Sequence, residues 1–163
     1  MMMNTLATGI LVVSLVLADR GAEAQNVKLK IQTKECAKGA VMNPKKVSVT
    51  VFDPSRVPAI VEMALDYELS ASRINEDGAD KAESKYFELR RRVDSARPLA
   101  RAKHLSAPDV VLAIPPVGKI IIFGFGETKS DFRYARRVMD LIPGRTKDIV
   151  LNFSTEEECK GAR

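Results

Sequence analysis

Tryptophan is absent from this sequence, and histidine occurs only once, at His104. Aromatic residues make up 6% of the chain, which argues against an aromatic-rich ligand groove or a platform that stacks nucleic-acid bases. The two cysteines, Cys36 and Cys159, form no Cys-x-x-Cys pair. With so few soft ligands, we expect neither a metal site nor a catalytic cysteine.

The sequence also lacks the pattern of a catalytic constellation. A nucleophilic triad would need His104 close to one of the cysteines, and nothing in their spacing indicates this. We expect His104 on the surface at the end of a helix, where it suits the helix dipole. Glu62, Asp66 and Glu68 lie near one another, and paired carboxylates can perform acid–base chemistry. On an amphipathic surface helix they more often form the hydrated face, so we do not expect an enzyme.

An apolar run near the start, Leu6–Ala18, has thirteen residues and no charge. A membrane span needs roughly 20 such residues, whereas this length is typical of a signal-peptide core. The small residues of Ala22-Glu23-Ala24 predict a signal peptide at 1–24, cleavage near Ala24, and export to the periplasm or the cell exterior. Because no Lys or Arg precedes the run, three alternatives stay open: cleavage after Ala18, an uncleaved amphiphilic anchor, and a buried first strand or helix.

The chain that follows this leader has a modest net charge. The whole chain has 26 basic and 21 acidic residues, and the leader contains Asp19, Arg20 and Glu23. The remaining chain therefore has 25 basic and 19 acidic residues, a net charge of +6. This charge permits contact with anionic lipid headgroups or acidic polymers but does not require it.

The two cysteines lie near the two ends of the segment that follows the leader. In an oxidising compartment such a pair predicts one disulfide, Cys36–Cys159. A chain-entropy estimate gives the closure of so long a loop about 4–5 kcal/mol of stabilisation. The alternative is two unrelated thiols.

Alternating or β-branched segments predict strands at 27–32, 47–52, 109–114, 119–125 and 148–153. Apolar residues at helical spacing lie between the second and third strands. The first expected helix presents Ile60, Val61, Ala64, Leu65 and Leu69, and the second presents Ala82, Tyr86, Leu89, Val93 and Ala96. We predict a single α+β domain over 25–163, a small antiparallel β-sandwich with a helical hairpin inserted at about 57–104.

The segment Gly118–Phe132, GKIIIFGFGETKSDF, fits two structures. In a nucleotide-binding βαβ unit, Gly124 and Gly126 would approach a phosphate at the start of a helix. That fingerprint needs a third glycine, which is missing, and Glu127 would lie beside the phosphate. The other structure is a sandwich strand, followed by Tyr134–Leu141, whose sequence does not decide between helix and strand. A cytosolic α/β nucleotide-binding protein stays the alternative if the leader is not cleaved.

Two blocks in series, Ile114–Phe125 and Asp140–Leu151, each combine a proline-glycine turn with an apolar strand. They resemble the end of carboxypeptidase-regulatory-like, or transthyretin-like, β-sandwich domains of exported bacterial proteins, and Val47–Asp53 is similar to an early strand of these domains. The resemblance implies a transthyretin-like sandwich without catalytic residues. It also implies that Gly124 and Gly126 allow a bulge or close packing at a strand end. The residues before Ile114 lack the glycine of the family's Thr-Asp-x-x-Gly-x-Phe turn.

Arginines form two clusters that are the candidate surface for an anionic partner. The clusters consist of Arg90, Arg91, Arg92, Arg97 and Arg101, and of Arg133, Arg136 and Arg137. Consecutive residues on a helix fan out by about 100° each, so the first cluster is not one stripe. The pattern indicates either a hydrated surface or a docking surface for anionic lipid, a cell-wall polymer or an acidic partner. Specific nucleic-acid recognition is not expected, because export removes most such substrates.

These features together predict an exported, non-catalytic interaction or accessory module of the cell envelope. We expect no cofactor, and an unknown protein or envelope component as the partner. One alternative is an envelope-associated binder of anionic lipid or polymer that uses the arginines and contacts the membrane surface. Another is a hydrolase whose site assembles from scattered residues.

Overall fold

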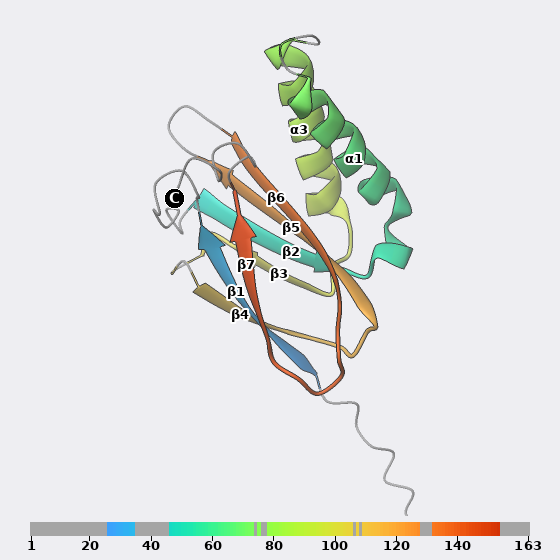
Figure 1. Ribbon diagram of the computed structural model, residues 1–163, viewed down its shortest axis with the longest axis vertical. Coiled ribbons are helices and arrows are strands. Elements are labelled where there is room, and N and C mark those ends of the chain that lie inside the picture. Colours follow the sequence, from blue (N-terminus) through green and yellow to red (C-terminus); the bar gives the residue numbers. More distant parts are fainter. Residues whose placement is uncertain are drawn as a thin grey trace, which may run out of the picture.

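Two β-sheets and a pair of helices make up the structure (Figure 1). The computed structural model describes residues 26–34, 46–73, 75, 78–105, 107, 109–127 and 132–153. The strands are β1 (Val27–Lys34), β2 (Val47–Phe52), β3 (Ala100–Lys103), β4 (Asp109–Ile114), β5 (Lys119–Glu127), β6 (Phe132–Asp140) and β7 (Lys147–Asn152). The helices are a short 3-10 turn, η3 (Pro54–Arg56), and the two α-helices α1 (Pro58–Ser72) and α3 (Ala79–Ser95). All five predicted strands are confirmed, with ends that shift by one or two residues.

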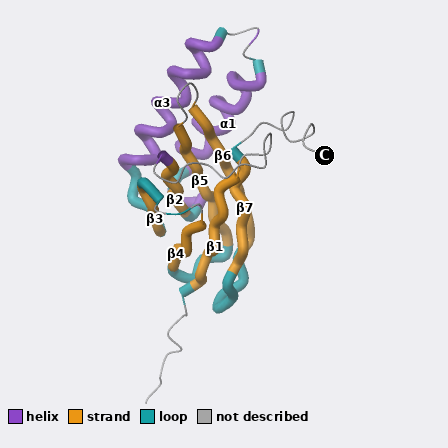
Figure 2. The backbone as a smooth tube through the Cα atoms, turned by 90° about the vertical axis from the view of Figure 1, so that its left-hand side faces the viewer, coloured by secondary structure: helices purple, strands orange, loops and turns teal. Residues whose placement is uncertain are grey.

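The strands form a three-stranded sheet in the order β4-β1-β7 and a four-stranded sheet in the order β3-β2-β5-β6. All pairs are antiparallel except β1 and β7, which run parallel with Ile31 opposite Ile149. The prediction of a purely antiparallel sandwich is therefore wrong for this pair. The coarser prediction, an α+β fold built on two stacked sheets, is confirmed (Figure 2).

The main core lies between the two sheets and follows from the two-residue period of the strands. On β1, Val27, Leu29 and Ile31 point into the sandwich and are at most 1% exposed, while the lysines between them face solvent. Residues from β2, β4, β5 and β7 complete this core. The alternation predicted from the sequence thus separates an inner apolar face from an outer polar one.

Strand β5 differs because it is buried on both faces. Ile120 and Ile122 belong to the core between the sheets, whereas Ile121, Phe123 and Phe125 belong to a second core under the helices. A strand covered on both sides needs a continuous apolar run rather than an alternating one. This requirement explains the sequence Ile-Ile-Ile-Phe-Gly-Phe in β5.

The helical hairpin packs on the outer face of the four-stranded sheet, away from β1, β4 and β7 (Figure 2). The predicted apolar face of α3 is confirmed, since Ala82, Tyr86, Leu89 and Val93 are all buried. The prediction for α1 is wrong in part. Ile60 and Ala64 face the sheet, but Leu65 and Leu69 are each 51% exposed, because they are turned too far around the helix to reach it. No helix in the described residues is long and apolar enough to cross a membrane.

One segment that was predicted to be helical forms a strand, and one segment that was left undecided also forms a strand. Strand β3 lies inside the expected helical insertion at about 57–104, so the helical part already ends at Ser95. The undecided segment Tyr134–Leu141 forms most of β6, which pairs antiparallel with β5. A βαβ unit needs a helix there and a parallel strand after it. The βαβ interpretation is therefore wrong, and the nucleotide-binding alternative loses the structure on which it depends.

Gly124 of β5 lies directly against side chains at the end of β7 and just after it. A Cβ atom built on Gly124 would lie 2.6 Å from Cζ of Phe153 and 3.4 Å from Cδ1 of Leu151. Glycine is required here because any side chain would overlap the ring. The ladder between β5 and β6 runs without interruption through Gly124 and Gly126. Close packing is thus confirmed at Gly124, and the bulge is not formed.

Candidate functional site

The outer face of the three-stranded sheet is the first candidate for a binding surface. Lys28, Lys30, Gln32 and Lys34 of β1 point outward, because their neighbours fill the core. The register aligns two rows across the sheet, Val111-Lys30-Asp148 and Asp109-Gln32-Val150. Each row therefore combines an apolar residue at one edge of the sheet with a carboxylate at the other.

A shallow groove of about 370 Å³ runs over this face. It is lined by Lys30, Ile31, Gln32, Asp109, Val110, Val111, Asp148, Ile149 and Val150. Val111 is 60% exposed and Val150 is 37% exposed. The helices cover the corresponding face of the other sheet, whereas within the described residues nothing covers this one (Figure 2).

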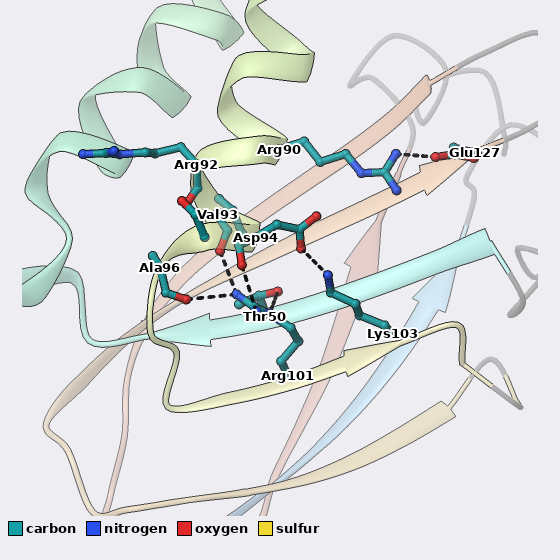
Figure 3. A network of polar contacts seen from close by, with 10 residues as sticks. Thr50, Arg90, Arg92, Val93, Asp94, Ala96, Arg101, Lys103 and Glu127 are labelled. Atoms are coloured by element: carbon teal, nitrogen blue, oxygen red, sulfur yellow. Dashed lines mark hydrogen bonds and ion pairs between the residues drawn. The ribbon is translucent and has the colours of Figure 1, made fainter.

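At least four of the eight arginines in the predicted surface make contacts inside the molecule. Arg101, on β3, points under the end of α3 (Figure 3). Its Nη2 donates to the carbonyl oxygens of Val93 at 2.7 Å and Ala96 at 3.1 Å, and its Nη1 donates to that of Asp94 at 3.1 Å. The last carbonyls of a helix have no partner in the helix itself. Arg101 supplies that partner and places a positive charge at the negative end of α3.

Two further ion pairs fasten α3 to the sheet beneath it (Figure 3). Arg90 contacts Glu127 at the end of β5, and Asp94 contacts Lys103 of β3, with 2.9 Å between Nζ and Oδ1. Burial lowers the pKa of Arg90, but the hydrogen bond to Glu127 and the electrostatic interactions with Tyr86, Glu127 and Asp94 together outweigh it, so this pKa is raised. Arg90 therefore acts as a packing residue of the hairpin.

Arg136 makes the equivalent contact to α1. Its Nε lies 2.7 Å from Oε1 of Glu68 and its Nη2 lies 2.8 Å from Oε2, so the pair is bidentate. The hydroxyl of Tyr134 donates to the same Oε1 at 3.1 Å. The hydrogen bond to Glu68 raises the pKa of Arg136. Glu68 is thus an anchor of α1 and not a free carboxylate.

The remaining arginines are distributed over different parts of the surface. Arg137 donates from Nη1 to the carbonyl oxygen of Val150 at 3.1 Å, which links β6 to β7 across the side of the sandwich. Arg133, on β6, is half-buried. Arg91, Arg92 and Arg97 are exposed, on and just after α3. The eight predicted residues are therefore not brought together on one surface.

The histidine and the acidic residues of α1 were the candidates for acid–base chemistry in the sequence. His104 is exposed, as expected, but it follows β3 and not a helix, since α3 ends nine residues earlier at Ser95. Its φ of +51° is a left-handed conformation. Asp66 pairs with Lys85 of α3 at 2.7 Å, and Glu62 is exposed. Among the described residues, no three His, Cys, Asp or Glu side chains are grouped so that they could hold a metal ion.

All three tyrosines of the chain lie between the helices and the four-stranded sheet. The ring centroid of Tyr67 lies 5.9 Å from that of Tyr86 and 5.0 Å from that of Tyr134. Burial raises the pKa of Tyr86 to about 12. Burial, and next the charge of Glu68, also raise the pKa values of Tyr67 and Tyr134. These hydroxyls are packing groups, and sequence reasoning missed the cluster because its members come from α1, α3 and β6.

The predicted disulfide, Cys36–Cys159, lies outside the described residues. The ends of the strands that lead to the cysteines are nevertheless neighbours. The backbone N–H of Phe153 donates to the carbonyl oxygen of Lys34 at 2.9 Å. The two segments that carry the cysteines therefore leave the sandwich from adjacent points.

Comparisons with known proteins assign this chain to no family. No family model matches the sequence. A search of curated proteins also gives no match. Function is therefore inferred from the surfaces of the molecule itself.

Proposed function

We propose that this chain is an exported, non-catalytic interaction or accessory module of the cell envelope, and that its partner docks on the outer face of the β4-β1-β7 sheet. The single observation that carries the proposal is the contrast between the two outer sheet faces. The helices cover the face of β3-β2-β5-β6, and Arg101, Arg136 and Arg90 are engaged there by groups of the chain itself. The opposite face keeps a groove with exposed valines and unburied charges.

The chemistry of that face favours a protein segment over a highly charged polymer. Lys30 lies between Val111 and Asp148, so positive charge, apolar surface and negative charge alternate over one row of strands. A polyanion would meet the carboxylates of Asp109 and Asp148 as well as the lysines. A protein segment can match such a row, because protein interfaces combine apolar contacts with hydrogen bonds.

A second candidate function is binding of anionic lipid or polymer through the arginines. The exposure of Arg91, Arg92 and Arg97 around the end of α3 favours it. This candidate predicts binding to vesicles of anionic lipid that falls steeply as salt rises. The variant Arg91→Gln/Arg92→Gln/Arg97→Gln should then lose that binding, and binding that ignores salt would exclude this function.

Within the β-sandwich class, we propose the transthyretin-like type. Two observations support this assignment. The resembling block Ile114–Phe125 spans the end of β4, a proline-glycine turn and β5, and the block Asp140–Leu151 spans the end of β6, a second such turn and β7. Those blocks therefore coincide with the strands that the resemblance assigns to them.

Export is tested by the intact mass of the full chain after expression in an exporting bacterial host. The sample is alkylated with and without prior reduction. We expect a mass that lacks residues 1–24, and alkylation of Cys36 and Cys159 only after reduction. The adjacency of Lys34 and Phe153 supports such a bridge. An uncleaved chain with two free thiols would overturn the assignment to the envelope.

The docking surface is tested by a photoreactive residue introduced in place of Lys30, with Glu88 as the matched control position. Both positions are exposed, but Glu88 lies on α3. We expect an adduct with an envelope component from position 30 only, and its loss when Val150→Lys places a charge in the groove. Equal labelling from both positions, or an adduct that survives Val150→Lys, would show that this face is not the docking surface.

A further inference from the structure

Strand β4 lies at one edge of the three-stranded sheet. Its residues pair with β1 from Asp109 opposite Gln32 to Ile114 opposite Val27. On its other side no strand of the described part of the chain is hydrogen-bonded to it. Strand β3 contacts β4 across the side of the sandwich, but it belongs to the other sheet. Half of the backbone hydrogen-bonding groups of β4 therefore face outward.

The other edge strands carry the features that normally prevent pairing with another chain, namely charge, short length or a covered edge. Strand β6 has three arginines, and β3 is four residues long with Arg101 and Lys103. On β7, the carbonyl oxygen of Val150 already accepts a hydrogen bond from Arg137 of β6. Strand β4 reads Asp-Val-Val-Leu-Ala-Ile, with one charge, no proline and a ladder to β1 without a bulge. Among the edge strands of the described residues, β4 is therefore the one without such a feature.

The sequence of β4 is complementary to itself. We propose that β4 pairs antiparallel with β4 of a second copy of this chain, so that the two three-stranded sheets join into one sheet of six strands. With Val111 opposite its own counterpart, Val110 faces Leu112 on the inner side and Asp109 faces Ala113 on the outer side. This register places Val111, which is 60% exposed in the single chain, against its counterpart on the outer face. It places no like charges opposite one another.

Two copies associate better by pairing their β4 edges than by stacking the outer faces of their three-stranded sheets. If two copies stacked their outer faces about an axis along β1, Lys30 would lie over Lys30. An edge ladder avoids this contact, and it leaves the part of the groove around Asp148 and Val150 uncovered.

With Val111 at the centre, the ladder covers five residues of each copy, 109–113. Pro115 follows β4 directly and Pro108 precedes it, and proline cannot donate to the ladder. An interface of this size predicts a dimer that dissociates on dilution.

The test is sedimentation velocity of the purified chain over a dilution series. We expect a monomer–dimer equilibrium and an increase of at least tenfold in the dissociation constant of the dimer for Val111→Lys, which puts two ammonium groups opposite one another. The matched control is Val150→Lys, on the same outer face at the other edge, which should leave the equilibrium unchanged. A chain that is monomeric throughout, a dimer that Val111→Lys leaves intact, or equal weakening by both variants would overturn the proposal.

A second variant tests the register in the opposite direction. Ala113→Lys places an ammonium opposite Asp109 of the second copy, twice per dimer, and should strengthen the dimer several-fold at low salt. This gain should disappear at high salt, where exposed pairs are screened. A weaker or unchanged dimer would overturn the pairing. Circular dichroism should show that all three variants keep the fold, since each changed side chain is exposed. The variant Val150→Lys distinguishes this dimer from docking of the envelope partner, since it should abolish docking and leave the dimer intact.

Discussion

The guanidinium of Arg101 lies 2.7 Å from the carbonyl oxygen of Val93, at the last turn of α3. These residues belong to the sheet and to the helix that covers it, so the contact fixes how the end of the hairpin sits on the sheet (Figure 3). Thr50 supports the arrangement from below, since its buried hydroxyl accepts a hydrogen bond from Nε of Arg101 at 3.4 Å. Arg101 was predicted to bind an external anion, but it donates hydrogen bonds to the carbonyl groups at the end of α3.

Replacing Arg101 by methionine should lower the free energy of unfolding by about 2 kcal/mol, because three carbonyl oxygens lose a charged donor. Arg97→Met is the control, since Arg97 is exposed in the same connection, and it should change stability by less than about 0.5 kcal/mol. Urea unfolding followed by circular dichroism measures both. Equal losses in the two variants would show that Arg101 contributes through general charge and not through its contacts with α3.

The bidentate pair of Glu68 and Arg136 should couple energetically. A double-mutant cycle with Glu68→Gln and Arg136→Met should give a coupling energy of about 1 kcal/mol, at the upper end for partly exposed pairs, because two parallel hydrogen bonds hold the geometry. The reference cycle uses Lys119 and Asp140, which are 3.7 Å apart and mostly exposed. That cycle should give nearly zero. A coupling in the first cycle no larger than in the second would contradict the role of Glu68 as an anchor.

Gly124→Ala should destabilise the protein by about 1–3 kcal/mol, because its methyl group would overlap the ring of Phe153, which is 2% exposed and cannot move aside freely. Gly118→Ala is the control, since a Cβ there would meet nothing within 4 Å. Combining Gly124→Ala with Phe153→Leu should cost less than the sum of the two single changes. Strict additivity would show that the overlap is not the cause.

Much of the fold could be predicted from the sequence, because the strands of the sandwich have one buried face and therefore alternate. The alternation of Val27–Gln32 gave the position and the inner face of β1 correctly. Strand β3 was missed because its four residues, Ala-Arg-Ala-Lys, contain no β-branched or large apolar residue to distinguish them from a helix end. Their pairing with β2 is a long-range contact that local preference does not encode.

The site was harder to predict than the fold. A cluster of arginines has the same composition whether it faces solvent or a helix end, and only the packing of α3 on β3 decides the role of Arg101. The groove on the outer face combines residues of β1, β4 and β7, which are distant in the sequence. The clearest local signal was the near absence of charge in Asp109–Ile114. An edge strand that is apolar on both faces has unpaired backbone groups and is suited to pairing with another strand.

The three tyrosines should make the stability of the protein fall at alkaline pH. The unfolded chain ionises its tyrosines near pH 10, whereas burial raises the pKa of Tyr86 to about 12 in the folded state. A raised pKa means that the folded state holds its proton longer, so the stabilisation is complete below pH 10 and is lost as pH rises from about 10 to about 12. Tyr67 and Tyr134 shift in the same direction and add to the loss.

The chain has no tryptophan and no other tyrosine, so absorbance at the tyrosinate band reports this cluster alone. Titration of the native protein should show little tyrosinate at pH 10 and a steep, cooperative rise at higher pH that coincides with loss of the circular dichroism signal. The same chain in urea should titrate smoothly near pH 10. A native titration that matches the one in urea would mean that these hydroxyls are in contact with water, and the packing of the hairpin on β6 would then have to be revised.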